Sequence, residues 1–70
     1  MTTSTTVSLL RWLRRQLREP TPNRERLEAA IANDDPAEAR RLLRGVDFND
    51  AQRHHVETLL DEWERERSER

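Results

Sequence analysis

The chain lacks cysteine and tyrosine altogether and has a single glycine among its 70 residues. Without cysteine, neither a disulfide framework nor a thiolate metal site can form. No apolar run approaches the length that spans a bilayer, and residues 7–13 are too short, and interrupted by Arg11, to serve as a signal-peptide core. These absences favour a cytoplasmic protein.

Lysine is also absent, so arginine supplies all 13 basic residues, set against 14 acids. The two signs are unevenly distributed along the chain. Residues 1–20 carry four arginines and one glutamate, a net charge of +3, whereas residues 47–70 carry four arginines and eight acids, a net charge of −4. This basic front and acidic back can orient the molecule when it associates with a partner.

The length allows one domain at most and lies near the lower limit for a self-sufficient hydrophobic core. Only one residue in three is hydrophobic, and 39% of the chain is charged. Monomer stability should therefore be low. Burying surface against a second chain, either a copy or a different protein, would compensate for this small core.

Four segments carry the apolar periodicity of amphipathic helices. We expect helices at about residues 7–19, 22–33, 36–44 and 49–66, joined by short connections. Together they predict an all-α fold, a small four-helix bundle with a short helical hairpin in the middle. The domain would span residues 7–66, with a disordered tail at 1–6 and a frayed end at 67–70.

Local signals place the helix ends. Thr21 and Asp35 each precede a proline and should cap the second and third helices, the latter with Glu38 completing a capping box. Gly45 should supply a left-handed stop after the third helix. Either Asp47 or Asn49 can cap the last helix, and we favour Asn49.

Catalytic and metal-binding patterns are missing. The adjacent side chains of His54 and His55 point about 100° apart on a helix, and neither has a ligating partner one turn further on. The serines lie in or beside the chain ends, with no motif that holds a base near them. We therefore expect no enzymatic activity, no metal, no cofactor and no small-molecule substrate.

The first helix offers the most informative surface. Its leucines share one face, Trp12 lies at the edge of that face, and four arginines gather opposite: Arg11, Arg14, Arg15 and Arg18. These arginines could be solvated and paired with the acids of the last helix, Asp61, Glu62 or Glu64. They could instead contact nucleic-acid phosphates, or belong to a membrane-surface or targeting segment.

We predict a non-catalytic protein–protein interaction module, such as a small adaptor, docking or regulatory protein. It would bind a protein partner or a second copy of itself through the first helix. The predicted contact residues are Arg11, Trp12, Arg14, Arg15 and Arg18, because tryptophan and arginine are enriched where binding energy concentrates. The alternative is a nucleic-acid-associated regulator that uses the same arginines. The acidic last segment argues against that alternative, and membrane binding is the least favoured.

Overall fold

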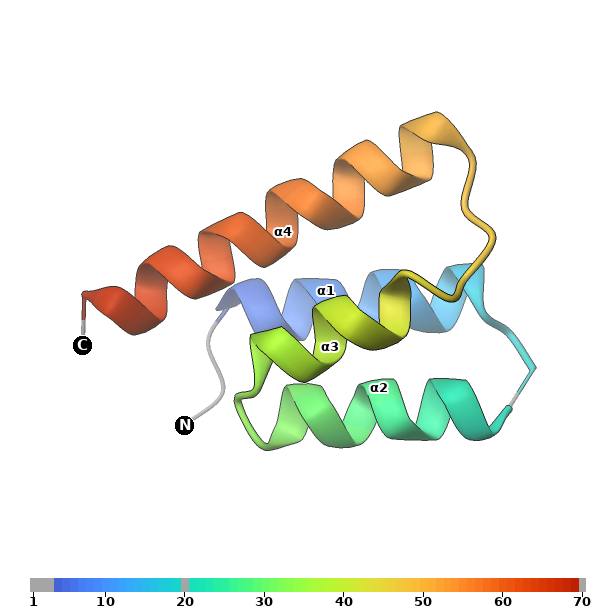
Figure 1. Cartoon of the computed structure of the whole chain (residues 1–70), viewed down its shortest axis with the longest axis horizontal. Helices are drawn as coiled ribbons and strands as arrows, with labels where there is room; N and C mark the ends of the chain where they lie inside the picture. The colour runs from blue at the N-terminus through green and yellow to red at the C-terminus, as the bar shows by residue number, and fades with distance from the viewer. Residues whose placement is uncertain (1–3, 20, 70) are drawn as a thin grey trace.

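The computed structural model describes residues 4–19 and 21–69. Within these ranges the chain forms four helices and no strand: α1 (Ser4–Gln16), α2 (Pro22–Ala32), α3 (Pro36–Leu43) and α4 (Asp50–Ser68). The helices run alternately in opposite directions, with α2 and α3 forming a tight hairpin (Figure 1). The predicted all-α bundle is confirmed.

The helices close into a ring around one core. Each helix packs against its neighbour in the chain, and α1 completes the ring by packing against α4. Trp63 is fully buried and is the largest side chain in this interior. The other buried hydrophobic residues come from all four helices and the link before α4: Leu9, Leu13, Leu27, Ala30, Ile31, Ala39, Leu43, Phe48, Val56 and Leu60. The apolar faces expected from periodicity therefore do merge into a single cluster.

Thr21 and Asn49 begin α2 and α4 as predicted. The Thr21 hydroxyl accepts a hydrogen bond from a backbone N–H in the first turn of α2 at 3.2 Å. Asn49 and Gln52 form a complete capping box, in which each side chain accepts from the backbone N–H of the other residue, at 2.8 and 2.9 Å. The choice of Asn49 over Asp47 is confirmed.

The ends of α3 differ in part from expectation. Asp35 caps the helix by accepting from the Glu38 backbone N–H at 3.2 Å, but the Glu38 carboxylate binds Arg41. The prediction of a left-handed Gly45 is wrong, because no glycine has a positive φ. Gly45 instead donates to the Leu42 carbonyl at 3.1 Å, which tightens the last turn without reversing its hand.

Helix α1 begins earlier and ends earlier than predicted. Residues 1–3 of the expected tail lie outside the described part of the chain, but residues 4–6 are helical rather than disordered. Thr5 and Thr6 are only 7% and 3% exposed, since the start of α1 packs against the end of α4. At its other end α1 stops at Gln16 instead of residue 19. In a continued helix the ring of a proline clashes with the carbonyl four residues earlier, and the proline at position 20 comes four residues after Gln16.

Helix α4 continues through Ser68, two residues beyond its predicted end. Arg67, expected to lie in a frayed segment, forms an ion pair with Asp34 at 3.5 Å. The end of α4 is thus joined to the turn between α2 and α3. A sequence pattern confined to α4 contains no sign of this long-range contact.

Candidate interaction surface

An open depression lies between α1 and α4 on the outside of the bundle. Its volume is about 490 Å³. We call the surface around it the α1–α4 face and define it by its lining residues: Ser8, Arg11, Trp12 and Arg15 from α1, and His55 and Leu59 from α4. It is the part of the molecule where the predicted first-helix site meets a second helix.

Two polar contacts hold the helices of this face together. Near the start of α1, the Thr5 hydroxyl donates to the Glu66 carboxylate. Near its end, the Gln52 side-chain amide donates to the Gln16 side-chain oxygen at 2.6 Å. Because one of these contacts lies at each end of α1, together they define the antiparallel register of α1 against α4.

Trp12 forms the aromatic centre of the face. Its ring lies 5.4 Å from that of Phe48 and 5.2 Å from that of His55, tilted by 52° and 39°. Phe48 is buried at 8% exposure, whereas His55 is exposed. Trp12 is therefore half-buried, supported on one side by the core and open to solvent on the other.

The structure brings together three of the five predicted contact residues. Arg11 and Arg15 are exposed beside Trp12 on the α1–α4 face. Arg14 points to the other side of α1, where its Nε lies 2.7 Å from a carboxylate oxygen of Glu28. Arg18 follows the end of α1 and is not among the residues that line the depression. Arg14 and Arg18 are therefore separated from the candidate site.

Asp61 and Glu64 of α4 pair with an arginine of α3, whereas the sequence suggested pairing with the arginines of the first helix. Arg40 of α3 contacts Asp61 at 3.0 Å and Glu64 at 3.2 Å. Its hydrogen bond to Glu64 is the largest influence on the guanidinium and raises the pKa of Arg40 above its usual range. Pairing of Arg14 with these acids is not found, because α1 and α3 approach opposite flanks of α4.

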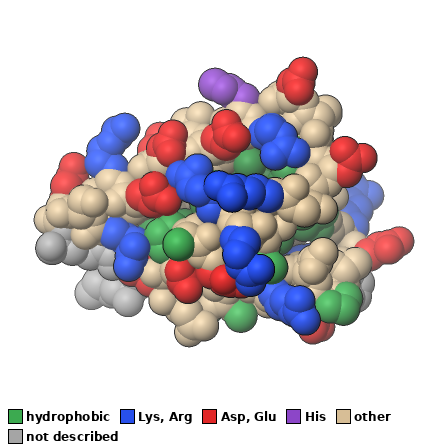
Figure 2. All heavy atoms as spheres, in the orientation of Figure 1, with side chains coloured by type: hydrophobic (Ala, Val, Ile, Leu, Met, Phe, Trp, Pro, Cys, Tyr) green, Lys and Arg blue, Asp and Glu red, His purple; other side chains and the backbone are tan. Residues whose placement is uncertain are grey.

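A second group of arginines lies between α3 and α4. Arg40, Arg44 and Arg53 line a small groove of about 110 Å³, together with Glu57 and apolar side chains. Figure 2 shows basic side chains gathered in the middle of this side of the molecule, with acidic ones beside them. Since this group and the α1–α4 face lie on opposite flanks of α4, the two do not form one continuous basic surface.

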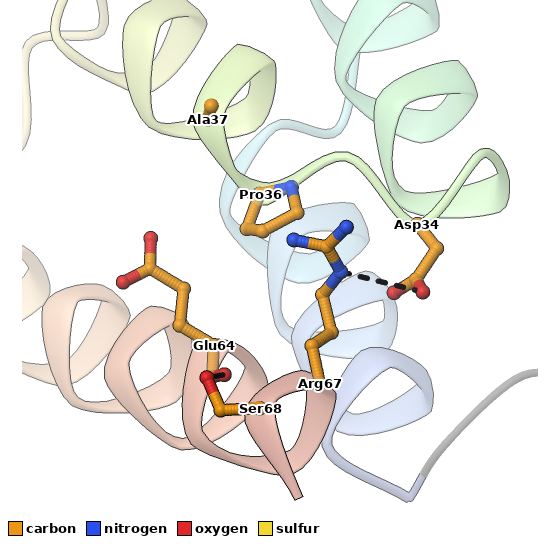
Figure 3. Close-up of a pocket in the computed structure, with 6 residues that line it drawn as sticks. All are labelled: Asp34, Pro36, Ala37, Glu64, Arg67 and Ser68. Atoms are coloured by element: carbon orange, nitrogen blue, oxygen red, sulfur yellow. Dashed lines mark hydrogen bonds and ion pairs between the residues drawn. The ribbon is translucent and has the colours of Figure 1, made fainter. Parts of the chain in front are cut away.

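Another groove, of about 570 Å³, lies where the α2–α3 turn meets the end of α4. Figure 3 shows Arg67 reaching toward Asp34 across this groove. Glu64, on its other side, binds Arg40. Because its charged residues already pair within the fold, this groove has the character of a structural joint rather than a ligand site.

In the described part of the chain, no three or more histidine, aspartate and glutamate side chains cluster so that they could hold an ion. None of its helices combines the length and apolar character needed to cross a bilayer. His54 and His55 are both exposed on α4, and His55 contacts Trp12.

Comparison with models of known protein families, with curated proteins and with solved structures gives no match to this chain. Its function must therefore be inferred from its own side chains and surfaces.

Proposed function

We propose that this protein is a non-catalytic protein–protein interaction module, of the adaptor, docking or regulatory kind, and that it binds its partner through the α1–α4 face. The observation that carries the proposal is the placement of Trp12, half-buried between Phe48 and His55 with exposed Arg11 and Arg15 beside it. A tryptophan held in this way loses little conformational freedom on binding and offers a large apolar surface.

The surroundings of Trp12 match the usual composition of an interface centre. Binding energy concentrates on tryptophan, tyrosine and arginine side chains surrounded by groups that exclude water. Leu59 supplies a second half-buried apolar side chain beside Trp12. Arg11 and Arg15 would set orientation and association rate through their charge. This combination favours a protein partner with an apolar anchor and nearby acidic groups.

A nucleic-acid-associated regulator is the second candidate. Trp12 could stack on an unpaired base while Arg11 and Arg15 contact phosphates, a combination used by proteins that bind single strands. However, α4 places Glu62 one helical turn from Leu59, and its carboxylate would repel a phosphate backbone there. A protein partner is therefore the better-supported proposal.

The test is a photo-crosslinking amino acid introduced at Ser8, on the rim of the face, in the cells that make the protein. The matched control carries the same residue at Glu25, an exposed position on α2. We expect a discrete crosslinked protein from position 8, none from position 25, and loss of the product when Trp12→Ala is added. Circular dichroism establishes that each variant remains helical.

Two results would contradict the proposal. Equal crosslinking from positions 8 and 25, or a product that survives Trp12→Ala, would show that the face has no special role. Crosslinks to nucleic acid that disappear with nuclease would instead favour the second candidate. In that case purified protein should lose affinity with salt by about 0.7 log units per log unit of salt for each phosphate contacted on a single strand.

A further inference from the structure

We infer that the partner on the α1–α4 face is a second copy of this chain, bound as a two-fold symmetric dimer. This inference rests on the proposed function and identifies its partner. It follows from the way in which charged and apolar side chains are ordered along the face, from one end to the other.

Arg15 lies at one end of the face, and Glu62 lies on α4 just beyond its other end, one helical turn after Leu59. Arg15 is adjacent to Gln16, whose side chain meets Gln52 at the beginning of α4. Glu62 precedes Glu66 by one helical turn, and Glu66 meets Thr5 at the beginning of α1. Both Arg15 and Glu62 are exposed. The surface is therefore basic at the Arg15 end of the face and acidic just beyond its other end.

Between these charges lie Trp12 and Leu59, both half-buried and both lining the depression. On α4, Leu59 and Glu62 are three positions apart, which places them on adjacent parts of one helix side. On α1, Trp12 and Arg15 have the same spacing. The order along this side of the molecule is thus basic at Arg15, apolar at Trp12 and Leu59 with exposed Arg11 beside them, and acidic at Glu62.

This order makes the face complementary to itself. A two-fold axis that passes between two such faces, over Trp12 and Leu59, exchanges their two ends. Arg15 of each copy then meets Glu62 of the other, and the apolar centres meet on the axis. One symmetry operation therefore forms two ion pairs and buries both tryptophans, without any residue from a foreign protein.

The size of the molecule fits such a contact. A standard specific interface buries about 800 Å² on each partner, which is about a sixth of the 4957 Å² that this chain exposes. A domain this small gains from added apolar burial, because its own core is near the lower limit for stability. A second copy is also present wherever the chain itself is made.

The experiment measures molecular mass by sedimentation over concentrations from about 1 µM to about 1 mM, which covers moderate and weak association. We expect the wild-type chain to change from monomer to dimer within this range. Arg15→Glu and Glu62→Arg should each raise the dissociation constant at least about tenfold, because each replaces two opposite-charge contacts with two like-charge contacts. The control Arg26→Glu reverses an exposed charge on α2 and should leave the dimer unchanged.

The decisive experiment mixes the two charge-reversed variants. A dimer of Arg15→Glu with Glu62→Arg restores an opposite-charge pair at both contacts, so the mixture should dimerise with wild-type affinity although neither variant does alone. A wild-type chain that stays monomeric throughout the range would overturn the inference, and so would a mixture that shows no recovery. If, at the same time, position 8 crosslinks specifically to a different protein, the proposed function stands and only the identity of the partner is wrong.

Discussion

The indole Nε1 of Trp63 donates a hydrogen bond of 2.6 Å to Oδ1 of Asp34, which lies 29 positions earlier in the chain. Trp63 is fully buried in the core. Asp34 belongs to the turn between α2 and α3 and has a φ of 56°, in the left-handed region. Aspartate and asparagine tolerate that region better than most residues. The side chain of Asp34 thus accepts a hydrogen bond from the core tryptophan, while the backbone of Asp34 forms the turn of the hairpin.

We expect Asp34→Ala to lower the free energy of unfolding by about 1–3 kcal/mol, because it leaves a buried indole N–H without this acceptor. Asp34→Asn should lose less, since asparagine keeps an acceptor oxygen and tolerates the left-handed backbone. Urea denaturation followed by circular dichroism measures both variants. In a Trp63→Phe background the cost of Asp34→Ala should shrink. An unchanged cost there would show that the hydrogen bond contributes nothing.

Helix caps could be predicted from the sequence because they depend on residues close together in the chain. Asn49 and Gln52 form their capping box within four positions, and Thr21 caps α2 over the same distance. The core could be predicted for a related reason. Val56, Leu60 and Trp63 repeat at helical spacing, and any bundle must bury such a stripe.

Contacts between distant residues could not be predicted in this way. Nothing local marks Asp34 as the acceptor for Trp63, or Glu28 as the partner of Arg14. For the candidate site, periodicity placed Trp12 at the edge of the apolar stripe, where it lies half-buried. Periodicity did not reveal that Arg14 faces α2 while Arg15 faces α4, because that division depends on how α1 is rotated in the bundle.

Removing the hydrogen bond between Thr5 and Glu66 tests whether the end of α4 stabilises the early start of α1. Thr5→Val keeps the side-chain volume but removes the hydroxyl donor, and we expect the free energy of unfolding to fall by about 1 kcal/mol. The matched control is Thr58→Val on α4, an exposed threonine whose hydroxyl donates within its own helix, to the His54 carbonyl at 2.9 Å, and whose loss should change stability by less than about 0.5 kcal/mol. Equal effects at the two positions, measured by thermal or urea unfolding, would contradict a stabilising role for the α1–α4 contact.

Arg24 supports the end of α1 from the neighbouring helix. Its Nη1 donates to the backbone carbonyls of Leu17 and Arg18, both at 3.1 Å, in the segment that directly follows α1. Arg24→Lys keeps the charge but replaces the planar fork with a point charge. We expect a loss of about 1 kcal/mol in the free energy of unfolding, and faster hydrogen exchange in the last turn of α1. Arg26→Lys, an exposed arginine on the same helix, is the control and should alter neither quantity.

The ion pair between Glu38 and Arg41 on α3 makes the stability of the protein depend on pH in the acid range. The hydrogen bond from Arg41, helped by attraction to its charge, lowers the pKa of Glu38 from its ordinary value, although partial desolvation opposes the shift. A lowered folded-state pKa stabilises the protein above the unfolded value, and this contribution disappears as pH falls through the folded value. The stability advantage of wild type over Glu38→Gln should therefore be present at neutral pH and vanish in acid below the Glu38 midpoint. Carboxyl-carbon NMR titration should give that midpoint below the ordinary value for a glutamate in wild type and a higher one in Arg41→Met. Arg44→Met should leave it unchanged, and a midpoint insensitive to Arg41→Met would show that the ion pair does not form in solution.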